Sequence, residues 1–97
     1  MKLQITPLAI FDLEYIADYI AEGSAKRAAT FVAELRAKFK QIAQNPNGYR
    51  VREELGAAIR SCAHGRYVIF FEHQQNVITI VRVLHSAREL TLIFPNE

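Results

Sequence analysis

The chain has 97 residues, a formal net charge of +2, 51% hydrophobic residues, one cysteine and no tryptophan. A chain this short supports one hydrophobic core, so residues 1–97 are expected to form a single domain, and the lone cysteine excludes an internal disulfide and a multi-cysteine zinc site. No apolar run approaches the length of a membrane helix, about 20 residues, and the first residues lack the apolar core of a signal peptide, which indicates a cytoplasmic protein that does not bind a membrane.

The first half of the sequence predicts a short strand followed by two helices. Leu3 and Ile5 alternate with polar residues, which predicts a short strand. Thr6 then supplies an N-cap and Pro7 takes the first helical position, so a helix is expected to start at about Pro7. This helix is expected to end at Gly23 as a C′ glycine, and Ser24 caps the next helix. The first helix has a wide apolar face made of two adjoining rows, Leu8, Phe11, Tyr15 and Tyr19 in one and Leu13, Ile16 and Ile20 in the other. In the second helix the apolar positions are Ala28, Phe31, Leu35, Phe39 and Ile42, before the turn at 45–48.

The second half of the sequence predicts strands. The runs Ile59 to Ala63, Tyr67 to Glu72 and Val77 to Leu84 are rich in β-branched and aromatic residues, and only three or four residues separate them. Links this short allow only antiparallel neighbours. The order β-α-α-β-β-β with segregated helices and strands indicates an α+β fold, in which an N-terminal helical hairpin packs on a small antiparallel sheet.

The candidate ligands and loops for a metal or a cofactor do not form a motif. Cys62, His64, His73 and His85 lack a metal-ligand spacing, and the four glycines are scattered singly rather than grouped in a phosphate-binding loop. The sequence therefore predicts neither a metal site nor a cofactor.

A set of arginines and one histidine in the second half is the candidate site. Arg82 interrupts an apolar strand, where a charge needs a partner, and a regular strand would place Ile78, Ile80, Arg82 and Leu84 on one face. Two readings follow: Arg82 forms an ion pair with Glu72 or Glu89, or it lines a concave anion-binding site. The full candidate set is Arg60, Arg66, Arg82, His85 and Arg88.

The run His85-Ser86-Ala87-Arg88 also has two readings. A histidine beside an arginine at a strand end can perform acid–base chemistry on a phosphodiester while the arginine stabilises the developing charge. The same residues can equally start a helix and form a protein-binding edge.

Several segments, in this order, carry a family resemblance: Asp12 to Ile20, Asn45-Pro46, Glu54 to Ser61, Gly65 to Phe71 and Arg82 to Leu90. They resemble the RelE/ParE superfamily of bacterial toxins over nearly the whole chain, and the ParE branch more closely. The resemblance implies the toxin of a type II toxin–antitoxin pair, of the kind associated with plasmid stabilisation, with a helical hairpin on an antiparallel sheet. ParE-like members poison DNA gyrase by trapping it on cleaved DNA, whereas RelE-like members cut messenger RNA in the ribosome. The implied partners are DNA gyrase and a cognate ParD-like antitoxin, with operator DNA bound only through the toxin–antitoxin complex.

The superfamily's ribonucleases differ from this chain at two places. They tend to have lysines just before the arginine that corresponds to Arg60 and a tyrosine near the C-terminus, whereas this chain has glycine and alanines at 56–58 and Phe94. These differences remove charge stabilisation and a candidate acid or base, which favours a gyrase inhibitor without catalysis. The alternatives are a messenger RNA endonuclease that uses His85, Arg60 and Arg82, and an inactive co-repressor that only binds antitoxin.

The binding surfaces are hypotheses from charge and position. The gyrase contact is expected at the C-terminal edge of the sheet, around Arg60, Arg82 and Arg88. The antitoxin is expected to lay an amphipathic or extended segment across hairpin and sheet and to pair its acidic residues with these arginines. Its apolar contact surface is expected to include Leu92, Ile93 and Phe94.

Overall fold

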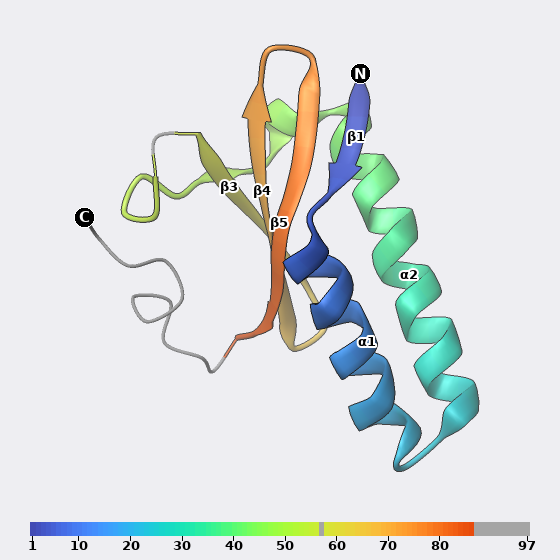
Figure 1. Ribbon diagram of the computed structural model, residues 1–97. Coiled ribbons are helices and arrows are strands. Elements are labelled where there is room, and N and C mark those ends of the chain that lie inside the picture. Colours follow the sequence, from blue (N-terminus) through green and yellow to red (C-terminus); the bar gives the residue numbers. More distant parts are fainter. Residues whose placement is uncertain (57, 87–97) are drawn as a thin grey trace.

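Two helices cover one face of a five-stranded sheet in the computed structural model, which describes residues 1–56 and 58–86 (Figure 1). This arrangement confirms the predicted α+β fold. The elements in chain order are β1 (Lys2–Ile5), α1 (Pro7–Ala21), α2 (Ala25–Gln44), a 3₁₀ turn (Pro46–Gly48), β2 (Arg50–Val51), β3 (Ile59–His64), β4 (Tyr67–Gln74) and β5 (Val77–His85). None of the described helices has the length and apolar character needed to cross a membrane.

The sheet is mixed rather than wholly antiparallel. Its strand order is β1-β5-β4-β3-β2, and β3, β4 and β5 form the predicted antiparallel meander, to which the short β2 adds a further antiparallel strand. β1 instead lies parallel to β5, with Lys2 opposite Val77 and Ile5 opposite Ile80. Short links force antiparallel pairing only between consecutive strands, and the whole helical hairpin lies between β1 and the rest of the sheet.

Both helices start as predicted, and the first one ends at the predicted glycine but without the left-handed conformation. The hydroxyl of Thr6 accepts a hydrogen bond from the N–H of Ala9, and the hydroxyl of Ser24 accepts one from the N–H of Arg27. Glu22 is the C-cap of α1 in a right-handed conformation, and Gly23 is not among the residues with positive φ. Gly23 therefore occupies the predicted C′ position directly after the C-cap, but the chain leaves α1 without the left-handed residue that a C′ glycine usually supplies.

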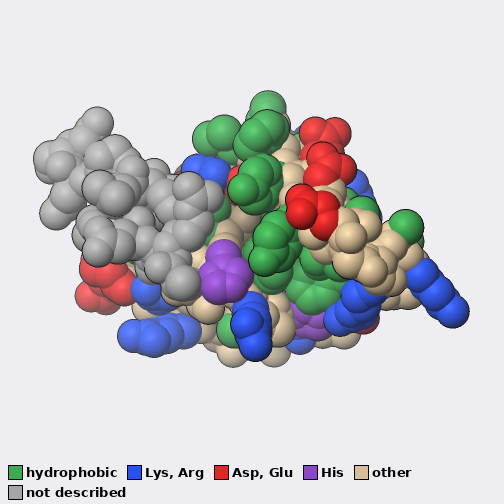
Figure 2. Space-filling view, turned by 90° about the horizontal axis from the view of Figure 1, so that it is seen from below, with side chains coloured by type: hydrophobic (Ala, Val, Ile, Leu, Met, Phe, Trp, Pro, Cys, Tyr) green, Lys and Arg blue, Asp and Glu red, His purple; other side chains and the backbone are tan. Residues whose placement is uncertain are grey.

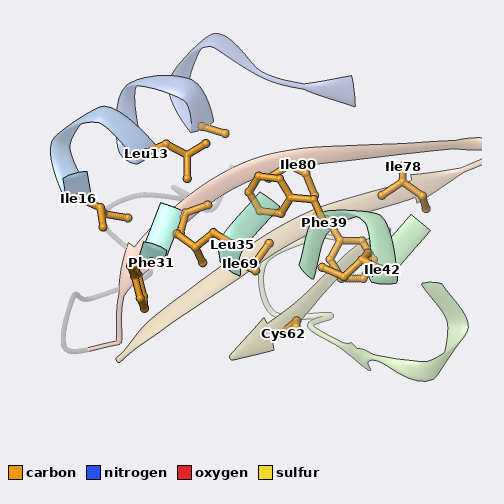
Figure 3. Packing of buried hydrophobic residues seen from close by; sticks show 13 residues of the cluster. Leu13, Ile16, Phe31, Leu35, Phe39, Ile42, Cys62, Ile69, Ile78 and Ile80 are labelled. Atoms are coloured by element: carbon orange, nitrogen blue, oxygen red, sulfur yellow. The ribbon is translucent and has the colours of Figure 1, made fainter. Parts of the chain in front are cut away.

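The main core lies between the helical hairpin and the sheet. Leu35, Phe39 and Ile42 of α2 are fully buried against the sheet, and α1 contributes its second apolar row. Figure 3 shows these side chains meeting those of the strands. The cluster consists of Ala9, Leu13, Ile16, Phe31, Leu35, Phe39, Ile42, Cys62, Ile69, Phe71, Ile78, Ile80 and Val83.

A β-bulge in β5 changes which residues share a face. Phe71 lies opposite Ile80 and Phe70 lies opposite Arg82, so Val81 is an extra residue on the β5 side. After the bulge Val83 joins Ile80 in the main core. Leu84 packs instead in a second cluster with Phe70 and Ile59. The prediction that Ile78, Ile80, Arg82 and Leu84 share one face is therefore wrong, because strict alternation ends at Val81.

Candidate functional site

Asp12 is a buried carboxylate on α1, and β5 holds it. It accepts hydrogen bonds from Nε of Arg82 at 2.8 Å, from Nη2 of Arg82 at 2.9 Å and from the backbone N–H of Val83 at 3.0 Å. The hydrogen bonds from Arg82 to Asp12 raise the pKa of Arg82. The ion-pair reading of Arg82 is thus confirmed with a different partner: Asp12, seventy residues earlier in the chain, rather than Glu72. Glu89, the other predicted partner, lies outside the described residues.

The start of α1 replaces a neighbouring strand along the last part of β5. β1 pairs with β5 only as far as Ile80. From there the N–H of Thr6 donates to the carbonyl of Ile80, the hydroxyl of Thr6 donates to the carbonyl of Val81, and Asp12 accepts from the N–H of Val83. Backbone polar groups at a sheet edge need partners, and these contacts supply them. The edge of β5 is therefore closed where α1 begins.

A groove with a volume of about 570 Å³ runs between α1 and the end of the sheet. Aromatic side chains of α1 form one wall, and the ends of β4 and β5 form the other. Because most of the residues that line it are aromatic or aliphatic and Arg82 is already paired with Asp12, the groove is suited to bind a partner surface with apolar side chains. Its lining consists of Phe11, Asp12, Tyr15, Ile16, Tyr19, Tyr67, Arg82, Val83, Leu84 and His85.

The outer apolar row of α1 is exposed beside this groove. Phe11 is 59% exposed, Tyr15 64% and Tyr19 63%, and Leu8 continues the row toward the N-terminus at 56%. Figure 2 shows a band of hydrophobic side chains on this face of the molecule, with acidic side chains along one flank. The sequence indicated that part of this helix face stays exposed, because two adjoining apolar rows make a face wider than one contact with the core can bury. Periodicity alone did not show which row stays outside.

Aromatic rings continue from the groove toward α2. Tyr67 meets His85 edge to face, with ring centroids 5.4 Å apart, and Phe31 of α2 lies 5.5 Å from Tyr67 and 5.4 Å from His64. Contacts of this geometry add to burial. They fix the ends of β3, β4 and β5 beneath α2, and so they hold the sheet wall of the groove in place.

Polar contacts of Glu34 tie α2 to the end of β3. Nε2 of His64 lies 2.9 Å from Oε1 of Glu34, and Nη1 of Arg27 donates to Oε2 of Glu34 at 2.7 Å. These two neighbours lower the pKa of Glu34, and the hydrogen bond from Arg27 is the larger cause.

The structure does not gather the candidate arginines at one point. Arg60 donates from Nη1 to the carbonyl of Tyr49 at 2.9 Å on β3, and β4 separates that strand from Arg82 on β5. Arg66 is exposed in the β3–β4 turn, and its carbonyl accepts from the N–H of Ser86 at the end of β5. Arg66, Arg82 and His85 therefore lie at or beside the groove. Arg60 does not, and Arg88 lies outside the described residues.

Metal binding and thiol chemistry receive no support from the described part of the chain. Within 1–56 and 58–86, no group of three or more His, Cys, Asp or Glu is placed to hold a metal ion. Cys62 is buried in the main core, and burial raises the pKa of its thiol, which disfavours the reactive thiolate.

Comparison with known proteins gives consistent matches. Residues 3–90 match the family described as "ParE toxin of type II toxin-antitoxin system, parDE". The curated protein Toxin ParE1 of Caulobacter vibrioides is 35% identical over 77 residues, covering 78% of this chain and 79% of that protein. A solved structure described as "Chromosomal ParDE TA system from P. aeruginosa" shares the fold with a TM-score of 0.74 at 23% sequence identity, covering 88% of this chain and 95% of that chain.

The family match places the chain in the toxin class of the type II toxin–antitoxin systems, and the fold agrees with it. The chain belongs to the ParE toxin family of the parDE systems. This membership implies a cognate antitoxin of the ParD type as its partner.

Proposed function

We propose that the protein inhibits DNA gyrase and thereby blocks replication in the bacterial cytoplasm, and that its antitoxin neutralises it by covering the groove between α1 and β5. The observation that carries this proposal is the exposed aromatic row of α1 beside the groove, in a chain of the ParE family. A contiguous apolar surface on a small protein marks an interaction site. Contact with operator DNA is expected only through the toxin–antitoxin complex.

The gyrase contact is proposed to centre on Arg66 and His85, at the end of the sheet. The sequence pointed also to Arg60 and Arg82, but both guanidinium groups have internal partners: Arg60 bonds the carbonyl of Tyr49, and Arg82 bonds Asp12. An arginine held in this way supports the fold and is a poor anchor for a second protein. Arg66 is exposed, and Arg88 stays a candidate outside the described residues.

The geometry does not favour the ribonuclease alternative. A nuclease built from His85, Arg60 and Arg82 needs all three side chains around one phosphate. Arg60 and Arg82 are instead on strands with β4 between them, and Asp12 occupies the fork of Arg82.

The test is a supercoiling assay with purified toxin and DNA gyrase, scored for lost supercoils and for accumulated cleaved DNA, beside ribosomes carrying messenger RNA. Inhibition with cleaved DNA and intact messenger supports the proposal. Codon-dependent messenger cleavage with unaffected gyrase would replace it with the ribonuclease reading. No effect in either assay, together with normal growth of cells that express the protein without antitoxin, would support the alternative of an inactive co-repressor that only binds antitoxin.

A matched pair of arginine variants tests the proposed contact. Arg66→Gln removes an exposed charge beside the groove, and Arg36→Gln removes an exposed charge on α2. Gyrase inhibition is expected to weaken several-fold in the first variant and to stay unchanged in the second, with both proteins folded by circular dichroism. Equal inhibition by the two variants would exclude Arg66 from the contact.

A further inference from the structure

We infer that the antitoxin segment filling the groove is an amphipathic helix that carries lysine or arginine on the flank facing α1, and not an extended or acidic segment. This inference rests on the proposed docking of the antitoxin at the groove. It differs from the expectation from sequence, which allowed an extended segment and gave the antitoxin acidic residues to pair with Arg60, Arg82 and Arg88.

The helical form follows from the closed edge of β5. A partner that adds a strand needs free backbone N–H and carbonyl groups along the edge. At this edge the carbonyls of Ile80 and Val81 accept from Thr6, and the N–H of Val83 donates to Asp12. An extended segment would leave its own backbone groups without partners there, whereas a helix satisfies its backbone internally.

The exposed row of α1 has the spacing and length for helix packing. Leu8, Phe11, Tyr15 and Tyr19 recur every three or four residues, so their side chains form a ridge along the helix surface. The ridge extends over about 16 Å, which is three turns of a facing helix. A second helix can set its own apolar ridge against it and reach the sheet wall of the groove.

The charge of the partner follows from the ionic groups left accessible beside this ridge. Glu14, Asp18 and Glu22 are exposed and recur every fourth residue, and α1 contains no lysine or arginine. None of them takes part in an ion pair among the described residues, whereas Arg82 is already paired with Asp12. The unmatched charge along α1 is therefore negative, and a partner with cations on that flank complements it.

A second copy of the chain does not meet this requirement. Its α1 would bring another aromatic row but also another row of acidic residues, and no cation to place against the first. Like charges brought together across an interface cost affinity. The acidic row thus favours a different partner over self-association through α1.

The test uses designed helical peptides of about 15 residues, enough for four turns. Each has the same leucine face with one tryptophan, and both flanks are either all lysine, all glutamate or all glutamine. Using the same charge on both flanks makes the result independent of the direction in which the peptide lies. The chain has no tryptophan, so peptide fluorescence reports binding without background.

The lysine peptide is expected to bind the full chain at low salt about tenfold more tightly than the glutamine peptide, and the glutamate peptide more weakly than both. The advantage should shrink as salt is raised. In the double variant Glu14→Lys/Asp18→Lys the order of the lysine and glutamate peptides should invert. Glu53→Lys, an exposed charge reversal in the loop before β3, should keep the original order.

Equal affinity of the three peptides, or tightest binding of the glutamate peptide, would overturn the inference. Tyr15→Ser should weaken all three peptides if they bind at the aromatic row, and unchanged binding by this variant would also overturn it. The gyrase assay is independent of these measurements. Failed gyrase inhibition with charge-selective peptide binding would reject only the proposed target, whereas inhibition with unselective binding would reject only this inference.

Discussion

At the scale of single residues, Asp12 has the largest structural role that the sequence did not reveal. It neutralises Arg82 and also supplies the acceptor that a neighbouring strand would have given to Val83. No spacing rule connects a residue in the first helix with one seventy positions later. The sequence therefore showed that Arg82 needs a partner, but it did not show which residue that partner is. The chemistry that demands a partner is readable from sequence, while the contact itself depends on tertiary structure.

The role of Asp12 predicts an asymmetry between two aspartates of the same helix. Asp12→Asn keeps the shape but leaves Arg82 without its counter-charge, at an expected cost of about 2–3 kcal/mol in the free energy of unfolding, given that Arg82 is partly exposed. Asp18→Asn changes an exposed residue and is expected to cost less than about 0.5 kcal/mol. Urea unfolding of both variants measures the difference. Similar midpoints would mean that the pair with Arg82 contributes little.

Glu34 predicts a pH dependence at the end of β3. Its folded-state pKa is lowered below 4.5, so its contribution to stability is complete above that unfolded value and is lost as the pH falls through the lower folded value. Arg27→Gln is expected to bring the pKa of Glu34 back toward 4.5, and His64→Gln to do so by a smaller amount, because the Arg27 hydrogen bond is the larger cause. NMR titration of the Glu34 carboxyl carbon checks both. A larger shift in the His64 variant would reverse the assigned order.

At the scale of elements, two glycines in turns are expected to differ in how well they tolerate a side chain. Gly65 has φ of +58°, and a Cβ built there would lie 3.4 Å from Cε1 of Phe31, whereas a Cβ on Gly23 would lie 3.8 Å from the nearest carbonyl with no positive φ. Gly65→Ala is expected to cost about 1–2 kcal/mol, because alanine disfavours the left-handed region. Gly23→Ala is expected to be neutral or to stabilise by up to about 1 kcal/mol through the unfolded chain. Thermal unfolding of the two variants tests this, and equal melting temperatures would contradict it.

The elements that could be predicted are those specified by local sequence. The N-caps at Thr6 and Ser24 and the meander from β3 to β5 follow from neighbouring residues and short links, and all are present. The parallel pairing of β1 and the bulge at Val81 could not be predicted, because each depends on how distant strands fit together. For the same reason the exposed row of α1 was not separable from its buried row until the sheet was in place.

At the scale of the whole molecule, stability should be highest in the middle of the sheet. Ile69, Phe70 and Phe71 of β4 are fully buried, and their strand has neighbours on both sides, whereas β2 is a two-residue edge strand with exposed side chains. Amides of β4 are expected to exchange with solvent only on global unfolding, and those of Arg50 and Val51 through local opening. Hydrogen exchange followed by NMR distinguishes the two. Exchange of β2 as slow as that of β4 would contradict this distribution.

The parallel pairing of β1 with β5 also determines when the groove can form during synthesis of the chain. Residues 2–5 find their partners only after residues 77–80 have been made, and at bacterial elongation rates this takes about 4–15 s. The hydrogen bonds of Thr6 and Asp12 to β5 also form only after β5 has been made. Until then, the sheet wall of the groove is absent. A nascent chain interrupted before β5 presents the surface of α1 without the structure that makes it a binding site. On the proposed function, toxicity and neutralisation are therefore expected to begin at the same late stage of translation.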